Sequence, residues 1–561
     1  MNGIYRLLVS VFLFLPFSAN AQKDSPWRIT KLMWTEQDEA KFGEFVTSLG
    51  AAIASRKCST VDRCLASAAN PYRGTDTSDL KPQADCADFP YYLRSYFAWK
   101  NGLPMSYESV VTARPVPGNN KGTDLRYTPY GNIVLARYDV VAGTAAYNEE
   151  WLASVYPDAV DFLNNQMGKF TWSASYRMMG LDDGPLFSDF YPAKINREAI
   201  RPGTVMYDPN GHVTIIYKVG DDGRVYYIDG HPDNTVSAGL FNAKFMRSIP
   251  EQGAGFKNFR PLFLVGARKD SSGAYVGGHI VGAKNASLTS LGTEQFYGTQ
   301  PDPKGDWNKG KFVFQGNVIS YYDYVRLRMA KGALKLDPVL DMQQDVADLC
   351  ESLKDRVIAV NQGILAGVQN KSHPDRLPEN IYGTVGEWEN YASPARDARL
   401  KVMYMELLSM AQNYITRFKA KDPTIVYKGK NLAKDLLTSY QRGSQACQIS
   451  YTTTNGIIVR MNLEDVRDRL FNMSFDPYHC VEFRWGATDM KELSSCHDDS
   501  NKREWYAREK WLRYQWQRQF EYRMDYSLDE LTGPLPGAGI AAPPDVNLES
   551  YLRSQLNPLQ Y

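Results

Sequence analysis

The chain has 561 residues, with 64 Lys and Arg against 63 Asp and Glu, so its formal charge is close to zero. A balanced charge excludes a protein whose main partner is a polyanion such as nucleic acid, because phosphate binding needs clustered, uncompensated cations. A chain of this length predicts two or three domains, each large enough for its own hydrophobic core.

The first 21 residues have the pattern of a secretory signal peptide. One cation, Arg6, precedes an apolar run from Leu7 to Phe17, and Ala19-Asn20-Ala21 forms a small-residue cleavage site. The run is too short to span a bilayer, and no later stretch predicts a membrane span. We therefore expect an exported protein, periplasmic or extracellular, whose mature chain starts near Gln22. Removal of Arg6 leaves 63 basic and 63 acidic residues.

After the leader, the pattern changes from helical to mixed and back to helical. The mixed region begins with a helix and continues with β-type runs, two of which are joined through Gly220-Asp221-Asp222-Gly223, a hairpin signal. Asp337-Pro338 and Ser393-Pro394 are typical starts of later helices. We expect an N-terminal helical segment at 22–70, an α+β domain at 71–265, an irregular Gly/Ser-rich connector at 266–336, an α-helical domain at 337–530 and a Pro/Gly-rich tail at 531–561.

A tryptophan-rich stretch near the C-terminus, residues 503–523, allows two interpretations. Trp505, Trp511, Trp516 and Phe520 alternate with cations, as on a surface that stacks nucleic-acid bases. However, Glu504, Glu509 and Glu521 offset several of the arginines. We favour a helix that packs its aromatic side chains into a core and leaves its charged face in water.

Seven cysteines in an oxidising compartment predict three disulfides and one remaining thiol. Cys58 with Cys64 and Cys480 with Cys496 each close a short loop, which leaves Cys350 for Cys447 and makes Cys86 the odd thiol. Zinc at His479, Cys480, Cys496 and His497 is the alternative for the last pair. Adjacent residues on an extended chain point to opposite faces, so we expect no metal and no other cofactor.

Cys86 lies where a helix begins. Pro90 lacks an amide hydrogen and is tolerated only in the first turn of a helix, so the helix carrying Phe89, Leu93 and Phe97 starts close to the thiol. The exposed amides of a helix N-terminus favour a thiolate, the form that attacks a carbonyl carbon. The neighbouring carboxylates Asp85 and Asp88 oppose this effect, so a cationic partner is required, and histidine is the usual one.

His212 is the best candidate for this partner, because it opens a strand directly after the turn "YDPNG". If Gly220 to Gly223 form a four-residue loop, position 212 lies opposite 231 and position 214 lies opposite 229. By the two-residue alternation of strands, His212, Asp229 and His231 then share one face. A nucleophile, a base and an orienting group in this arrangement resemble a catalytic triad. Asp229 is favoured as the third member, with His231 as the alternative.

Two stretches resemble the NlpC-type cell-wall cysteine peptidases of the papain-like superfamily: "NPYRGTDTSDLKPQADCADFPYYLRSYFAWKNGLP" and "IRPGTVMYDPNGHVTIIYKV". The resemblance covers about residues 70 to 235. It implies a papain-like fold, with Cys86 as nucleophile, His212 as base and Tyr72 near the oxyanion site. It also implies cleavage of amide bonds in peptidoglycan stem peptides. The chain departs from the family where Ala87-Asp88 replaces Ser-Gly and Thr204 replaces an aspartate.

Three functions remain open on the sequence. The first is a thiol hydrolase acting on a peptide or peptidoglycan-type substrate. The second is a transglutaminase-like acyltransferase that uses the same Cys-His-Asp site with an amine in place of water. The third is a non-catalytic envelope binding or scaffold protein whose helical C-terminal domain contacts an unknown partner. We also expect aromatic residues of the insertion at 105–200 to wall the substrate cleft: Trp151, Tyr156, Phe162, Trp172, Tyr176, Phe187 and Tyr191.

Overall fold

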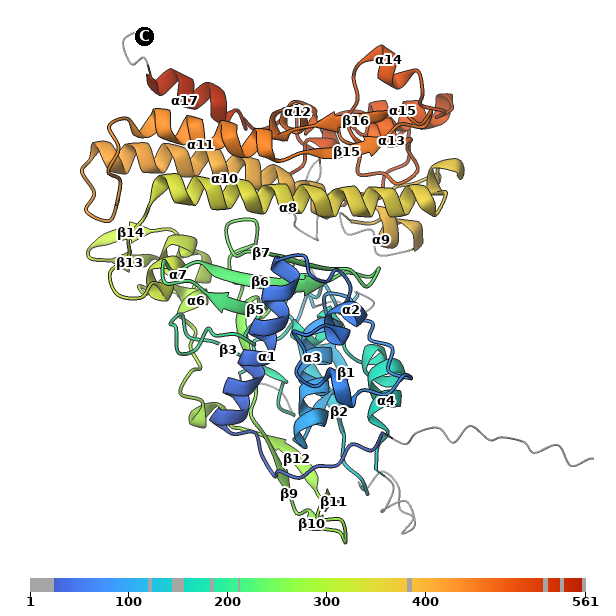
Figure 1. Cartoon of the computed structure of the whole chain (residues 1–561), viewed down its shortest axis with the longest axis vertical. Helices are drawn as coiled ribbons and strands as arrows, with labels where there is room; N and C mark the ends of the chain where they lie inside the picture. Colours follow the sequence, from blue (N-terminus) through green and yellow to red (C-terminus); the bar gives the residue numbers. More distant parts are fainter. Residues whose placement is uncertain are drawn as a thin grey trace, which may run out of the picture.

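The structure is a computed structural model that describes residues 25–119, 124–143, 156–181, 186–209, 212–380, 386–517, 523–534 and 539–556. The expected signal peptide and Trp151 lie outside these residues. The described chain contains helices and antiparallel strands, which confirms the α+β class. A layer of long helices lies across one end of a sheet-containing part (Figure 1). No helix among the described residues is long and apolar enough to cross a membrane.

A six-stranded antiparallel sheet forms the centre of the sheet-containing part. Its strands lie in the order β3 (Phe190–Pro192), β8 (Gly255–Phe259), β4 (Val205–Asp208), β5 (His212–Val219), β6 (Val225–Gly230) and β7 (Val236–Leu240). In the β5–β6 hairpin Ile215 pairs with Ile228, and this register, continued outward, puts position 212 opposite 231 as predicted. An irregularity between Ile216 and Lys218 shifts the pairing by one residue nearer the turn.

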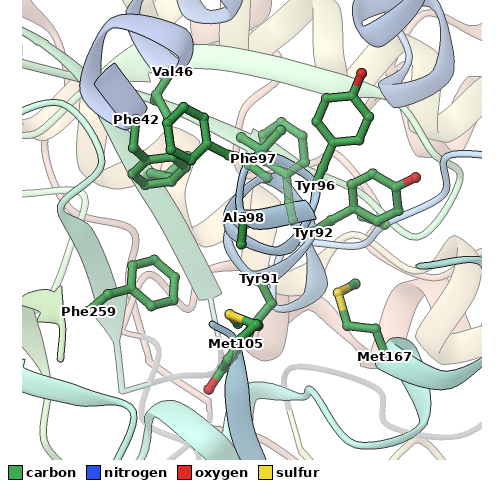
Figure 2. Close-up of a cluster of buried hydrophobic side chains, with 14 of the residues drawn as sticks. Phe42, Val46, Tyr91, Tyr92, Tyr96, Phe97, Ala98, Met105, Met167 and Phe259 are labelled. Carbon is green, nitrogen blue, oxygen red and sulfur yellow. The ribbon is translucent and has the colours of Figure 1, made fainter. Parts of the chain in front are cut away.

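One face of the sheet is covered by α1 (Glu36–Ala54) and α3 (Asp88–Asn101). The apolar residues of α1 recur at helix spacing and are at most 4% exposed: Phe42, Phe45, Val46, Leu49 and Ile53. Thr35 caps this helix, since its hydroxyl accepts the backbone N–H of Asp38 while the Asp38 carboxylate accepts the N–H of Thr35. Figure 2 shows Phe42 and Val46 facing Phe97 of α3. The short α2 (Val61–Ala66) comes between α1 and α3 in the chain.

A buried ion pair joins α1 to α3. The Arg94 guanidinium donates two hydrogen bonds to the carboxylate of Glu39, at 2.8 and 2.5 Å, and stacks over the ring of Trp34. Arg94 is 2% exposed, so the pair lies in a medium of low polarity where charge-assisted bonds are strong. The contact fixes the helix that begins beside Cys86.

The segment after the sheet, expected to be an irregular connector, contains short strands and helices that return to the sheet. β12 (His279–Gly282) pairs with β9 (Leu262–Val265), while α7 (Tyr321–Met329) packs on the second face of the sheet. The other elements here are β10 (Arg268–Lys269), β11 (Tyr275–Val276), α6 (Glu294–Tyr297), β13 (Phe312–Phe314) and β14 (Asn317–Ile319). Earlier in the chain, the insertion forms the hairpin β1 (Ser106–Ala113) and β2 (Asn132–Asp139), then α4 (Ala159–Asp161) and α5 (Ser173–Tyr176).

The C-terminal region is mostly helical, as predicted, and two of its helices begin at the predicted prolines, Pro338 and Pro394. Asp337 accepts the N–H groups of Val339 and Leu340 at the start of α8 (Pro338–Leu365), and α10 (Pro394–Lys419) begins at its proline. The remaining elements are α9 (Gly386–Tyr391), α11 (Leu432–Ala446), β15 (Ile449–Thr452), β16 (Ile458–Met461), α12 (Leu463–Arg469), α13 (Val481–Arg484), α14 (Met490–Leu493), α15 (Ser500–Arg508), α16 (Lys510–Arg513) and α17 (Leu548–Leu556).

The described part of the tryptophan-rich stretch contains one fully buried tryptophan, Trp505, whereas Trp511 and Trp516 are half-buried. Trp505 on α15 is 2% exposed and belongs to a buried cluster, which supports the core interpretation over a base-stacking surface. The stretch is divided between two short helices, and Phe520 and Glu521 lie outside the described residues.

All three predicted disulfides are present: Cys58–Cys64, Cys350–Cys447 and Cys480–Cys496. Cys86 is the cysteine left as a thiol. The zinc arrangement at Cys480 and Cys496 is excluded by their disulfide.

An acidic face of α8 docks the helical layer onto the sheet-containing part. Lys244 Nζ lies 2.8 Å from Asp348 Oδ2, with both side chains 3% exposed. One turn earlier on α8, Asp345 lies 2.6 Å from the guanidinium of Arg224. A further turn earlier, the guanidinium of Arg326 donates to both carboxylate oxygens of Asp341. These carboxylates recur at helix spacing and are matched by cations from the other part, so the two parts form one body with a built interface.

Candidate active site

Cys86 lies between the start of α3 and the open end of the β5–β6 hairpin. The Asp85 carboxylate accepts the N–H groups of Ala87 and Asp88, at 2.8 and 2.9 Å, and so begins the helix. The backbone N–H of Val213 is hydrogen-bonded to the Cys86 sulfur. The thiol thus contacts the backbone of the residue that follows His212 on β5. Gly230, at the end of β6, lies so close that an added Cβ would meet the carbonyl oxygens of Ala84 and Asp85 at 3.0 Å.

The predicted base and orienting group are in direct contact. His212 Nε2 lies 2.8 Å from Asp229 Oδ2, and the hydroxyl of Ser237 donates to Asp229 Oδ1. His231 is farther away, with Nε2 at 3.9 Å from Asp229 Oδ1 and 3.2 Å from the Ser237 hydroxyl. Asp229 is therefore the direct partner of His212, whereas His231 lies near Asp229 and contacts the hydroxyl of Ser237. Because Nε2 faces Asp229, Nδ1 is the nitrogen left to meet the thiol.

Burial sets the resting charges of the site. Desolvation, followed by the charge of Asp85, raises the pKa of Cys86 above its ordinary value, although the Val213 N–H acts in the opposite direction. Desolvation and the charge of Arg399 lower the pKa of His212, although Asp229 opposes them. Burial alone would raise the pKa of Asp229, but His231, His212 and Ser237 hold it well below its usual range. The resting pair at neutral pH is a thiol beside a neutral imidazole.

This charge state corrects the expectation of a preformed thiolate at the helix N-terminus. The helix end is present, but its first amides bond to Asp85, and the sulfur lies in a partly buried position where a charge is poorly solvated. Activation then has to occur as substrate arrives, by proton transfer from the thiol to His212.

Tyr72 is not at the site, which corrects the assignment carried over from the family. Its hydroxyl accepts a hydrogen bond from the Asn101 amide at 3.0 Å, at the C-terminal end of α3, and its ring packs on Phe45 and Phe97. Cys86 precedes the N-terminal end of that helix. The 14 residues of α3 separate the two ends by about 20 Å, at about 1.5 Å per residue.

Other tyrosines surround the thiol instead: Tyr176, which was expected in the cleft wall, and Tyr127 and Tyr207, which gave no signal in the sequence. Burial and, among the nearby groups, the charge of Cys86 raise the pKa of Tyr127, Tyr176 and Tyr207. The Tyr176 hydroxyl is occupied, donating to the carbonyl of Ala87 at 2.7 Å. The Tyr207 hydroxyl accepts from Arg177 at 3.3 Å, which leaves its own hydrogen as a candidate donor to an oxyanion.

Aromatic residues of the insertion divide between core and surface. Tyr176 lies beside Cys86 but is fully buried, as are Phe162 and Tyr191 in the hydrophobic core. Trp172 is 39% exposed, and Tyr156 and Phe187 are partly buried. Core packing thus accounts for Phe162, Tyr176 and Tyr191, because a wall of a substrate cleft has to remain accessible.

The helical layer adds residues to the site that sequence reasoning missed. A small cavity of about 50 Å³ beside His212 and Asp229 is lined on its other side by Asp355, Arg396 and Arg399. It shares Asp355 and Arg396 with a cleft of about 450 Å³ between the end of α1, β7 and α8. Arg396 and Arg399 are one turn apart on α10, but nothing in that spacing indicates contact with residues nearly two hundred positions earlier.

These three charged side chains have no hydrogen bond or ion pair within the described part of the chain. Desolvation and the neighbouring Arg399 lower the pKa of Arg396. Burial raises the pKa of Asp355 to about 6, against the nearby cations. Charged groups left without direct partners beside a cavity are suited to a ligand that brings opposite charge.

Comparisons of the chain with protein-family models, with curated proteins and with solved structures found no match.

Proposed function

We propose that this protein is an exported cysteine hydrolase that cleaves an amide bond, with Cys86 as nucleophile, His212 as base and Asp229 as orienting group. The observation that carries the proposal is the convergence of three distant segments. The Cys86 sulfur accepts the N–H of Val213, and the adjacent His212 lies 2.8 Å from Asp229. A thiol, an imidazole and a buried carboxylate in this order form the arrangement of a cysteine protease.

The charge state suggests how the reaction starts. As the sulfur attacks the carbonyl carbon, Nδ1 of His212 takes the thiol proton, and Asp229 stabilises the imidazolium that forms. The imidazolium then gives the proton to the leaving amine, and a thioester remains on Cys86. Water, deprotonated by His212, hydrolyses this thioester and restores the thiol. The same sequence with an amine in place of water is the acyltransferase alternative.

The substrate class follows from the motifs and from the cleft. The NlpC-type motifs favour peptidoglycan stem peptides, and an antiparallel sheet with the nucleophile at a helix start is compatible with a papain-like arrangement. We infer that the substrate also carries an acidic group, bound by Arg396 and Arg399, because these guanidinium groups face the cavity beside His212 without partners of their own. Three disulfides are compatible with export to an oxidising compartment.

The test is digestion of purified peptidoglycan by the wild-type protein and by Cys86→Ala, with products identified by mass spectrometry. We expect new free amines and carboxylates from the wild type and none from the variant. Exposed His279→Ala is a matched control that leaves the site intact. Products with an added amine, formed when a primary amine is supplied, would instead indicate the acyltransferase. Equal inactivity of both proteins on peptidoglycan and on peptide amides would favour the non-catalytic scaffold.

A further inference from the structure

A second cluster of ionisable side chains lies inside the helical layer, among the residues that pack around Trp505. His373 comes from the loop after α8, Asp476 and His479 from one turn, and Glu509 from the junction of α15 and α16. All four side chains are 0% exposed. Three segments of the chain, at residues 373, 476–479 and 509, thus bring two imidazoles and two carboxylates to one buried point.

The atoms that face one another are potential metal ligands. His373 Nε2 lies 2.8 Å from Asp476 Oδ2, and His479 Nε2 lies 3.3 Å from the same oxygen and 3.5 Å from Glu509 Oε2. Tetrahedral ligands at about 2.0–2.2 Å from a zinc ion are about 3.3–3.6 Å apart. Two of these three separations match this spacing, and the His373–Asp476 pair would open by about 0.5 Å around an ion. The ligand atoms of His373, Asp476 and Glu509 all lie within 4.8 Å of one another, so a four-ligand site also needs His479 to move toward His373.

Each potential ligand is oriented by a further partner. His373 Nδ1 lies 2.6 Å from the carbonyl oxygen of Pro374, and His479 Nδ1 lies 3.2 Å from Asp498 Oδ2. An imidazole that donates its Nδ1–H outward presents a lone pair on Nε2 inward, as metal-binding histidines do. Asp476 Oδ1 accepts the N–H of Tyr478, which leaves Oδ2 for the cluster.

Glu509 provides the independent evidence for a ligand. Both of its carboxylate oxygens are buried and make no hydrogen bond of good geometry, and the nearest nitrogen, His479 Nε2, lies 3.5 Å from Oε2. A carboxylate removed from water without hydrogen bonds is costly unless a cation compensates it. A divalent ion with two neutral imidazoles and two carboxylates gives a neutral buried site.

We propose that His373, Asp476, His479 and Glu509 bind one divalent transition-metal ion, and that this ion is zinc. Imidazole nitrogen with carboxylate oxygen is a ligand set that zinc accepts, and four protein ligands in a closed, fully buried site are typical of structural rather than catalytic zinc. The ion joins the loop after α8 to the segments at 476–479 and 509. It is independent of the Cys480–Cys496 disulfide, whose sulfurs are not available as ligands.

The test is metal analysis of the full-length, disulfide-intact protein by inductively coupled plasma mass spectrometry. We expect one zinc per chain, loss of zinc and a lower thermal midpoint after dialysis against a chelator, and recovery of both on adding zinc but not magnesium. Glu509→Gln should lower the bound zinc strongly, whereas His279→Gln, an exposed histidine on β12, should leave it unchanged.

Wild-type protein with no bound metal, and with a thermal midpoint that neither the chelator nor zinc changes, would overturn the proposal. Retention of calcium or magnesium alone would also overturn it. Because these measurements use the wild-type chain, they decide the question even if a ligand variant fails to fold. They do not depend on peptidase activity, so the proposal stands or falls separately from the function of Cys86.

Discussion

Asp229→Asn is the sharpest test of the proposed triad, because the change preserves shape and removes only charge and acceptor capacity. In the wild type both carboxylate oxygens are used: Oδ2 faces His212 Nε2 at 2.8 Å, and Oδ1 accepts the Ser237 hydroxyl. An asparagine that keeps the bond from Ser237 turns its NH₂ group toward Nε2. Nε2 must then accept, so the imidazole proton moves to Nδ1, the nitrogen that has to receive the proton of Cys86.

The expected loss is large. Tautomer inversion in a serine triad lowers turnover by about 10⁴-fold, and a loss of about 10³–10⁴-fold here corresponds to about 4–5.5 kcal/mol of barrier. Initial rates of peptide release from peptidoglycan should be normalised to the thiol titre, with circular dichroism to establish that the fold is intact. The matched control is Asp221→Asn on the exposed turn between β5 and β6, expected to stay within about twofold of the wild type.

Turnover of Asp229→Asn equal to that of Asp221→Asn, with both proteins folded, would refute the role of Asp229. A greater loss in His231→Ala than in Asp229→Asn would make His231 the third member of the site.

Four further outcomes are expected from the same structure. Arg399→Gln should shift the acid limb of the kcat/KM profile to higher pH, because loss of that charge lets the pKa of His212 rise toward its ordinary 6.5; an unchanged limb would contradict the placement of Arg399. Cys86 should react with iodoacetamide without prior reduction but more slowly at neutral pH than a model thiol, and Asp85→Asn should accelerate the reaction; a rate above the model thiol would contradict a raised pKa. Joint replacement of Cys350 and Cys447 by Ser should lower the free energy of unfolding by about 2–5 kcal/mol in urea titrations, since the crosslink closes a long loop; an unchanged midpoint would contradict this. Asp348→Asn, which leaves Lys244 buried without its partner, should cost about 3–5 kcal/mol by the same titration, and a cost near zero would show that the interface is hydrated.

Much of the local structure could be predicted because it depends on short-range chemistry. Pro90 and Pro338 mark helix starts, since proline lacks the amide hydrogen that only the first turn can spare. The alternation of β5 and β6 was sufficient to bring His212 and Asp229 to one face before any contact was known. The odd number of cysteines and the two pairs that close short loops were sufficient to predict the three disulfides and Cys86 as the remaining thiol.

The tertiary structure decided what depends on burial and on distant partners. The pKa of Cys86 follows the loss of water around the sulfur, which no pattern near residue 86 contains, so its resting state was predicted with the wrong charge. Tyr72 was assigned by its position in a motif, yet packing carried it to the opposite end of α3.

The contacts between segments far apart in the chain could not be predicted from the sequence either, because they depend on tertiary packing. Arg399 reaches His212 only because α8 docks its acidic face onto Arg224, Lys244 and Arg326. His373 meets Glu509 only through the packing of the helical layer. The sequence by itself determined the helix starts, the strand alternation and the placing of His212 and Asp229 on one face, because those depend on neighbours along the chain. The protonation states, the arginines beside the site and the buried cluster around Asp476 depend on which surfaces exclude water together, and only the tertiary structure determines that.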